Sequence, residues 1–145
     1  MNKGIILITG SVMNSDEGLV NTYKSLISMI NIQKYQVSTP LDTMMFRGTD
    51  YERYERAMEL LKDTKLMIAE MSNVSTGQGM ELQQAVILNI PILVIAKTGS
   101  KISGLVKGCK NVKNIIYYNN IDDISSNIKR FIEEECNEIN MQNNW

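Results

Sequence analysis

The chain alternates short apolar runs with stretches in which apolar residues recur every three or four positions, and this alternation restricts the fold more than any other feature. The apolar runs end at turn residues, which is typical of buried strands in a parallel sheet. Five strands are predicted, at Ile5–Ile8, Tyr35–Thr39, Leu66–Glu70, Ile92–Ala96 and Val112–Tyr118.

The stretches between these strands predict helices. Helices are expected from about Asp16, over Asp50–Lys62, after the Gly77–Gly79 loop with Glu81 in the first turn, and from Asp122, with a loop over 40–49 and a short segment near Ser103–Lys107. Strands that alternate with helices form parallel sheets with right-handed crossovers. We therefore predict one α/β domain over residues 1–145, with a flavodoxin-like (Rossmann-like) five-stranded parallel sheet of order 2-1-3-4-5 and helices on both faces.

Composition excludes several classes of function. The net charge of −1 over 145 residues, with no basic stripe, argues against a nucleic-acid polymer as partner. Histidine is absent, and the two cysteines, Cys109 and Cys136, are far apart, so His-based catalysis and most zinc sites are excluded and no metal is expected. The apolar run near the amino terminus is too short for a signal peptide or a membrane span, so we expect a soluble, cytoplasmic protein with no membrane partner.

Residues 75–85, STGQGMELQQA, place two glycines and one carboxylate between a predicted strand and a predicted helix. Gly77 and Gly79 would let backbone N–H groups approach a ligand closely, and the start of a helix favours an anion. Glu81 is expected in the first turn of that helix, where it either complements the helix dipole or performs chemistry.

In a sheet of order 2-1-3-4-5 the switch point lies between the first and third strands, which is where open α/β sheets bind ligands. The loop at Gly10 and Ser11 and the loop over 72–79 should flank one crevice there. Ser11 could equally cap the following helix, and Ser103 could cap the short segment after it.

The stretch 69–82, AEMSNVSTGQGMEL, resembles the nucleoside 2-deoxyribosyltransferase family, most closely the 2'-deoxynucleoside 5'-monophosphate N-glycosidases with their pattern S-x-G-x-G-x-E. The resemblance implies a homodimer that acts on a small-molecule nucleotide without a cofactor. It implies that Glu81 attacks C1' of the sugar, that Ser75, Gly77, Gly79, Gly10 and Ser11 hold the 5'-phosphate, and that Ser103 reaches the neighbouring subunit's phosphate. Ser75 stands where members acting on unphosphorylated nucleosides tend to carry Asp, so monophosphates are the expected substrates.

The chain departs from the family pattern at three positions. Ala57 stands where the family has an aspartate that assists the leaving base, Leu7 stands where it has an aromatic residue, and Met13 stands where it has an arginine. Arg47, Glu55 and Tyr54 are candidates to replace these groups, and Glu70 at the end of the third strand is a candidate for a supporting role.

Four hypotheses follow from the sequence. The leading one is hydrolysis of the N-glycosidic bond of a nucleoside 5'-monophosphate, with Glu81 as nucleophile. A second is base exchange between deoxyribonucleosides, which requires an acceptor base. A third, supported by the three departures, is a nucleotide-binding or sensing protein without catalysis. The fourth is an unrelated flavodoxin-like phosphate binder, in which Glu81 would have no role.

Overall fold

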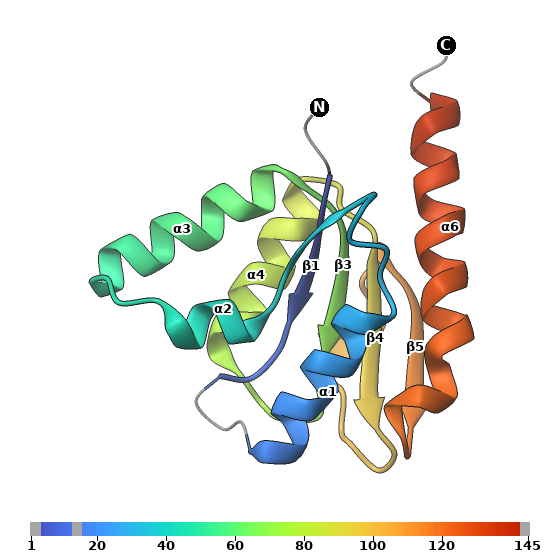
Figure 1. Cartoon of the computed structure of the whole chain (residues 1–145), viewed down its shortest axis with the longest axis horizontal. Helices are drawn as coiled ribbons and strands as arrows, with labels where there is room; N and C mark the ends of the chain where they lie inside the picture. Colours follow the sequence, from blue (N-terminus) through green and yellow to red (C-terminus); the bar gives the residue numbers. More distant parts are fainter. Residues whose placement is uncertain (1–3, 13–15, 143–145) are drawn as a thin grey trace.

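A computed structural model of the chain describes residues 4–12 and 16–142, and the side chains of residues up to 136. Five parallel strands form one sheet of order β2-β1-β3-β4-β5, which confirms the predicted fold (Figure 1). The strands are β1 (Ile5–Thr9), β2 (Gln36–Ser38), β3 (Thr64–Glu70), β4 (Ile92–Lys97) and β5 (Val112–Tyr118).

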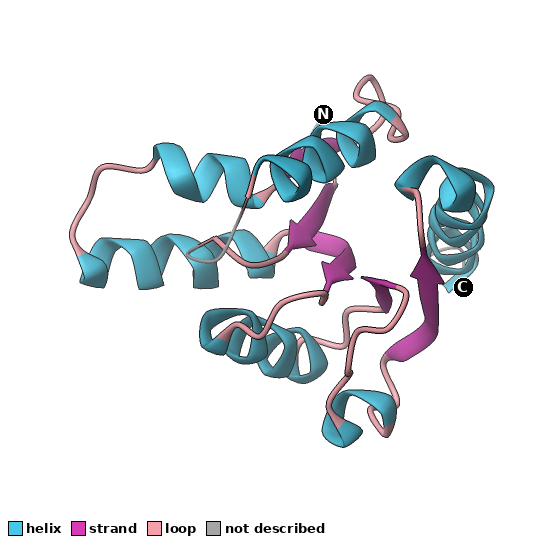
Figure 2. Ribbon diagram, turned by 90° about the horizontal axis from the view of Figure 1, so that it is seen from below, coloured by secondary structure: helices cyan, strands magenta, loops and turns pink. Residues whose placement is uncertain are grey.

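Strands β1, β3 and β4 lie in the middle of the sheet, and nearly all of their side chains are buried, because helices cover both faces (Figure 2). On one face, side chains of α1 and α6 pack with Ile6, Ile8 and Ile68; on the other, side chains of α3 and α4 pack with Leu7, Met67 and Val94. The helices are α1 (Glu17–Ser28), α2 (Pro40–Met45), α3 (Asp50–Lys62), α4 (Thr76–Ile87), α5 (Gly104–Lys107) and α6 (Ser125–Gln142).

The prediction of a loop over 40–49 is wrong for its first half, where α2 forms. Thr39 caps this helix by accepting a hydrogen bond from the backbone N–H of Leu41, and the Asp42 carboxylate accepts one from the backbone N–H of Thr39 at 2.9 Å. Pro40 occupies the first helical position, where its missing N–H costs nothing. Helix α2 brings its residues against the carboxyl end of β1, beside the candidate site.

The position of Glu81 also differs from the prediction. Ser75 is the N-cap of α4, and Gly77 and Gly79 lie within the helix rather than in the loop before it. Glu81 is therefore in the second turn, and no acidic residue lies in the first. The stabilisation of a carboxylate by the helix dipole falls off beyond the first turn, so it does not account for this carboxylate.

The last helix begins later than predicted. A 3₁₀ turn, η1 (Ile121–Ile124), occupies the segment that starts at Asp122, and α6 follows from Ser125. Ile121 and Ile124 of this turn are buried beside α1, so the turn closes one end of the core.

Candidate active site

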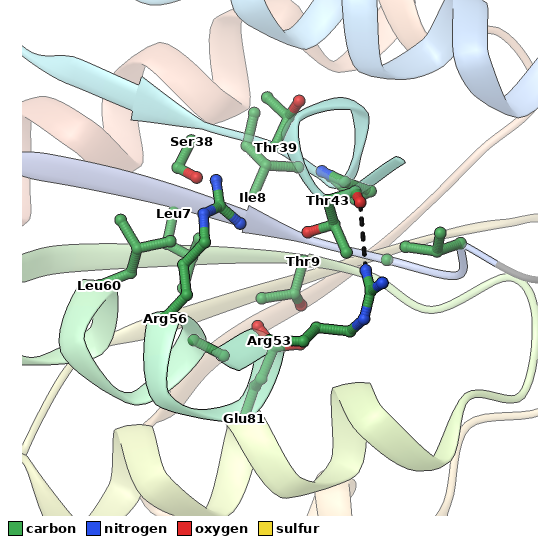
Figure 3. Close-up of a pocket in the computed structure, with 14 residues that line it drawn as sticks. Leu7, Ile8, Thr9, Ser38, Thr39, Thr43, Arg53, Arg56, Leu60 and Glu81 are labelled. Atoms are coloured by element: carbon green, nitrogen blue, oxygen red, sulfur yellow. Dashed lines mark hydrogen bonds between the residues drawn. The ribbon is translucent and has the colours of Figure 1, made fainter. Parts of the chain in front are cut away.

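Glu81 lines a small pocket at the carboxyl end of β1. Side chains and backbone from β1, from α2 and from α3 surround it, and its volume is about 60 Å³ (Figure 3). A cavity of this size holds only one or two water molecules, so a larger ligand would have to lie across its mouth. The lining residues are Leu7, Ile8, Thr9, Gly10, Val12, Ser38, Thr39, Pro40, Thr43, Arg53, Arg56, Ala57, Leu60 and Glu81.

The Glu81 carboxyl group is partly buried, and this burial raises its pKa from 4.5 to about 7. Within the described residues no ion pair reaches this carboxylate. A buried carboxylate without a counter-ion destabilises the fold, and such costs concentrate at functional sites. This shift brings the ionisation of the Glu81 carboxyl group close to neutral pH.

The two glycines of α4 are not required by the packing of the chain. A Cβ added at Gly77 or at Gly79 would meet no heavy atom within 4 Å, and neither residue has a positive φ. Each glycine costs a helix about 1 kcal/mol relative to alanine. Gly77 lies one turn before Glu81, and a side chain there would cover the helix surface leading to the carboxylate.

A buried hydrogen-bond network fixes the start of α4 against the sheet. The Gln78 Nε2 group donates to Thr9 Oγ1 at 3.0 Å and to the Glu70 carbonyl at 2.9 Å. Gln78 Oε1 is buried and has no hydrogen-bond partner in the described part of the chain. Sequence reasoning did not single out Gln78, because a glutamine inside a glycine motif carries no signal before α4 is placed against β1.

Glu70 joins the same network from β3. Its carboxylate accepts hydrogen bonds from the backbone N–H of Ser72 at 2.6 Å, from the Ser72 hydroxyl at 2.9 Å and from the Tyr118 hydroxyl. Burial and the neighbouring Glu70 raise the pKa of Tyr118 above its ordinary value. Glu70 does not line the Glu81 pocket, so its contacts in the structure hold the segment before α4 in place.

The loop after β1 packs on Tyr23 of α1. The Tyr23 hydroxyl donates to the Ser11 carbonyl at 2.8 Å, and Ser11 is buried. A Cβ on Gly10 would overlap the Tyr23 hydroxyl, so packing favours glycine at this position, which also lines the pocket. Ser11 is not among the residues that line the pocket.

We expect Gly10→Ala to destabilise the protein by about 1 to 3 kcal/mol, because the added methyl group overlaps the Tyr23 ring. Urea denaturation measures the loss. Tyr23→Phe removes the overlapping hydroxyl, so the double variant should lose less stability than the sum of the two single variants. Additive losses would contradict this packing.

A second, larger hollow of about 630 Å³ lies on the other side of α4. Three of the predicted site residues line it: Ser75, Gly79 and Ser103. Ser103 is exposed and caps α5, accepting from the backbone N–H of Leu105 at 3.2 Å. The predicted site residues are therefore divided: Glu81 and Gly10 line one hollow, Ser75, Gly79 and Ser103 line the other, and Gly77 lines neither.

Two arginines of α3 were missed by the sequence reasoning. Arg53 and Arg56 line the Glu81 pocket, and Figure 3 shows their side chains crossing it from α3. The suggested substitutes, Arg47, Glu55 and Tyr54, do not line it. Ala57 and Leu7 do line the pocket, so two of the departures from the family pattern fall at the site. The third, Met13, lies outside the described residues.

The described side chains include no cluster of three His, Cys, Asp or Glu residues that could hold a metal ion. No helix in the described part of the chain is long and apolar enough to cross a membrane.

Comparison with curated proteins finds relatives that share one name. No family model matches the chain. The chain is 29% identical over 109 residues to "Putative 2'-deoxynucleoside 5'-phosphate N-hydrolase 1" of Methanosarcina barkeri, a match that covers 71% of this chain and 68% of the relative. It is 37% identical over 60 residues to the protein of the same name from Methanococcoides burtonii, covering 41% and 49%.

Solved structures share the fold. The chain matches BlsM with a TM-score of 0.76 and 17% identity, covering 95% of this chain and 94% of that one. It matches the Clostridium botulinum CMP N-glycosidase BcmB with a TM-score of 0.66 and 18% identity, covering 85% and 97%. A 2-deoxyribosyltransferase from Bacillus psychrosaccharolyticus matches with a TM-score of 0.63 and 15% identity, covering 83% and 90%.

The fold is that of the deoxyribosyltransferases. The predicted resemblance to the nucleoside 2-deoxyribosyltransferase family is confirmed, since the curated relatives carry the name of a nucleotide N-hydrolase and the solved neighbours include a deoxyribosyltransferase and a nucleotide N-glycosidase.

Proposed function

We propose that the protein hydrolyses the N-glycosidic bond of a nucleoside 5'-monophosphate, releasing the free base and a sugar phosphate. The observation that carries this proposal is the partly buried Glu81 carboxyl group in a pocket at the carboxyl end of β1, with its pKa raised to about 7 and no counter-ion among the described residues. The names of the curated relatives support the same class of reaction.

Glu81 acts as the nucleophile in this proposal. An oxygen of its ionised carboxylate attacks C1' of the sugar as the bond from C1' to the base nitrogen breaks, which gives a glycosyl ester. Water then cleaves the ester and regenerates the carboxylate. Neither step requires a metal or an organic cofactor.

The 5'-phosphate binds at the start of α4, where the first backbone N–H groups of the helix are available and the dipole favours an anion. Gly77 and Glu81 are four residues apart on the helix, a rise of roughly 6 Å, which is about the span of a pentose. The open space at Gly77 supports a close approach by the phosphate there. Gly10 adjoins this place from the Glu81 pocket, and Ser75 and Gly79 adjoin it from the hollow on the other side of α4. Ser11 is buried, so its role in this proposal is to support the loop at Gly10.

A matched pair of variants, Ser75→Asp and Ser75→Asn, tests whether the 5'-phosphate binds near Ser75. Both side chains cap a helix well, so α4 should persist in each variant. Only the aspartate repels a phosphate dianion, and like charges in contact cost several kcal/mol. We expect Ser75→Asp to lower kcat/KM for monophosphates about 100-fold while sparing nucleosides, and Ser75→Asn to lose far less. Steady-state assays measure kcat/KM for the monophosphate and for the nucleoside in each variant. Equal losses in the two variants would contradict phosphate binding near Ser75.

The active form in this proposal is a homodimer in which Ser103 reaches the neighbouring site. The hollow beside Ser103 is largely apolar, and Leu105 and Val74 along it are each 89% exposed in the single chain. Exposed apolar side chains of this kind favour an interface. We expect Leu105→Glu to convert a dimer to a monomer in light scattering and to lower activity. A wild-type protein that is monomeric at all concentrations would contradict the dimer.

The alternative with a specific observation behind it is a nucleotide-binding protein without turnover. Ala57 and Leu7 line the Glu81 pocket and supply neither an acid nor an aromatic surface. Base exchange is a further alternative within the enzyme class. It differs from hydrolysis because product forms only when an acceptor base is supplied.

A panel of ribonucleoside and deoxyribonucleoside 5'-monophosphates tests the proposal. Chromatography should detect free base from at least one nucleotide, with the corresponding nucleoside cleaved more slowly. Tight binding in a thermal-shift assay without base release over a long incubation would favour the binding protein. Release only in the presence of an acceptor base would favour exchange.

A further inference from the structure

Two arginines of α3 face the Glu81 pocket, and neither forms an ion pair with an acidic residue in the described part of the chain. The guanidinium groups of Arg53 and Arg56 lie 5.3 and 5.4 Å from the centre of the same Phe46 ring, so both cations lie beside this one aromatic side chain. Arg53 Nη1 donates one long hydrogen bond, 3.4 Å, to the Thr43 carbonyl. The ion pair found among the described residues joins Lys62 and Glu59 and involves neither arginine.

These guanidinium groups carry more N–H donors than the single hydrogen bond from Arg53 to Thr43 uses. Each guanidinium group carries five N–H donors in a planar fork and no acceptor, and it stays protonated at any ordinary pH. Both arginines are half-buried, and Figure 3 shows both side chains within the pocket. The Phe46 ring stabilises both cations but accepts no hydrogen bond in the plane of a guanidinium group. The pocket therefore offers N–H donors to the acceptor atoms of a ligand.

The direction of the substrate, which rests on the proposed function, decides which acceptors these are. With the phosphate at the start of α4 and C1' at Glu81, the base extends from C1' away from the phosphate. The remaining walls of the pocket are α2 and α3, which present Thr43, Arg53 and Arg56. Ala57 adds only a methyl group to this wall and supplies no acid that could protonate a base.

We propose that Arg53 and Arg56 form the subsite for the leaving base, select bases that carry a ring carbonyl oxygen, and stabilise the negative charge that the base acquires as it leaves. The substrate class is then a nucleotide of uracil, thymine, cytosine or a 6-oxopurine. Adenine, which has an amino group in place of the carbonyl, is disfavoured because it sets donors against donors.

The step balances without a general acid. The Glu81 oxygen forms the bond to C1', and the electron pair of the broken C1'–N bond stays on the base and spreads to its carbonyl oxygen. That oxygen accepts hydrogen bonds from the guanidinium groups, which remain protonated. The water that later cleaves the glycosyl ester gives its hydroxyl to C1' and releases a proton, which neutralises the departed base.

Calorimetry on the Glu81→Gln variant tests this subsite without turnover. The ligands are uridine 5'-monophosphate and ribose 5-phosphate, which differ only by the base. Arg53→Ala and Arg56→Ala should each weaken uridine 5'-monophosphate binding at least about tenfold, the usual loss for a hydrogen bond to a charged group, and leave ribose 5-phosphate within twofold. Arg56→Lys, which keeps the charge and most of the stem, should lose less. Arg47→Ala, an exposed arginine outside the pocket, is the control and should change neither affinity.

Equal weakening of both ligands would place the phosphate on the arginines and overturn the proposal. No weakening of uridine 5'-monophosphate, or no binding of it by the parent, would also overturn it. Nucleotide binding that depends on the arginines in a protein that releases no base would remove the proposed hydrolysis and leave the base subsite intact.

Discussion

Replacing Glu81 by glutamine is expected to lower the release of free base from a nucleoside 5'-monophosphate by about 10⁴-fold or more, the scale seen when a nucleophile is removed. Glutamine keeps the size of the side chain and has a hydrogen-bonding terminus, but its amide oxygen does not form a stable ester with C1'. Steady-state assays of base release measure the loss. The affinity for nucleotide should change far less than kcat.

The matched control for this variant is Glu55→Gln. Glu55 is an exposed glutamate on α3 that does not line the pocket, so the same chemical change there should leave activity within about twofold, as surface substitutions usually do. Glu81→Gln retaining most of its activity would show that another group, or water alone, attacks the sugar.

The second large effect is a dependence of activity on pH with a single ascending limb. Burial raises the pKa of Glu81 to about 7, and only its ionised form attacks. Below that pH, kcat/KM should fall about tenfold per unit. Above it, activity should stay level, since the arginines beside the pocket do not lose their protons. A profile that falls above pH 7 would indicate that Glu81 acts as an acid.

The same pKa shift predicts a change in stability. Because the folded-state pKa lies above the ordinary value of 4.5, the folded protein binds the extra proton between pH 4.5 and 7. This contribution to stability is present below pH 4.5 and is lost as the pH rises through 7. Each pKa unit corresponds to about 1.4 kcal/mol. At pH 8 the free energy of unfolding of Glu81→Gln should therefore exceed that of the wild type by about 1 to 3 kcal/mol. The difference should shrink toward pH 5, as measured by urea denaturation.

The order of the strands and several element boundaries could be predicted from local signals. Helix α3 has the predicted bounds because Thr49 and Glu52 form a capping box at its start, and apolar positions recur on one face. Strand β5 likewise matches its apolar run. Helix α2 carries the same kind of start signal in Thr39, Pro40 and Asp42, but its six residues are too few to show a helical period in the sequence.

That Glu81 lies near the carboxyl end of β1 was also predictable, but its place in the second turn of α4 and the division of the site were not. Once α4 is known to start at Thr76, Ser75 and Gly79 fall on one side of the helix and Gly77 and Glu81 on another. The glycines predict a loop up to the glutamate, and a loop gives no indication of which residues share a face of α4. A helix start placed from the Ser75 cap would have separated the two groups.

Arg53 and Arg56 could not be identified from the sequence for a different reason. They lie in a helix where charged residues alternate, and such a pattern usually marks a face in contact with water. Only the packing of α3 beside β1 and α2 turns that face into the wall of a pocket. Gln78 was missed in the same way, because its partners Thr9 and Glu70 come from two other strands.

The central claim is that Glu81 forms a covalent bond to the sugar, and intact-protein mass spectrometry with a slow substrate tests it most directly. A nucleoside 5'-monophosphate with fluorine at the 2' position slows both steps and allows the intermediate to accumulate. We expect a mass increase equal to one fluorinated sugar phosphate, released base in equal amount, and an adduct on the peptide that contains Glu81. Base release with an unmodified protein, or an adduct on another residue, would contradict it.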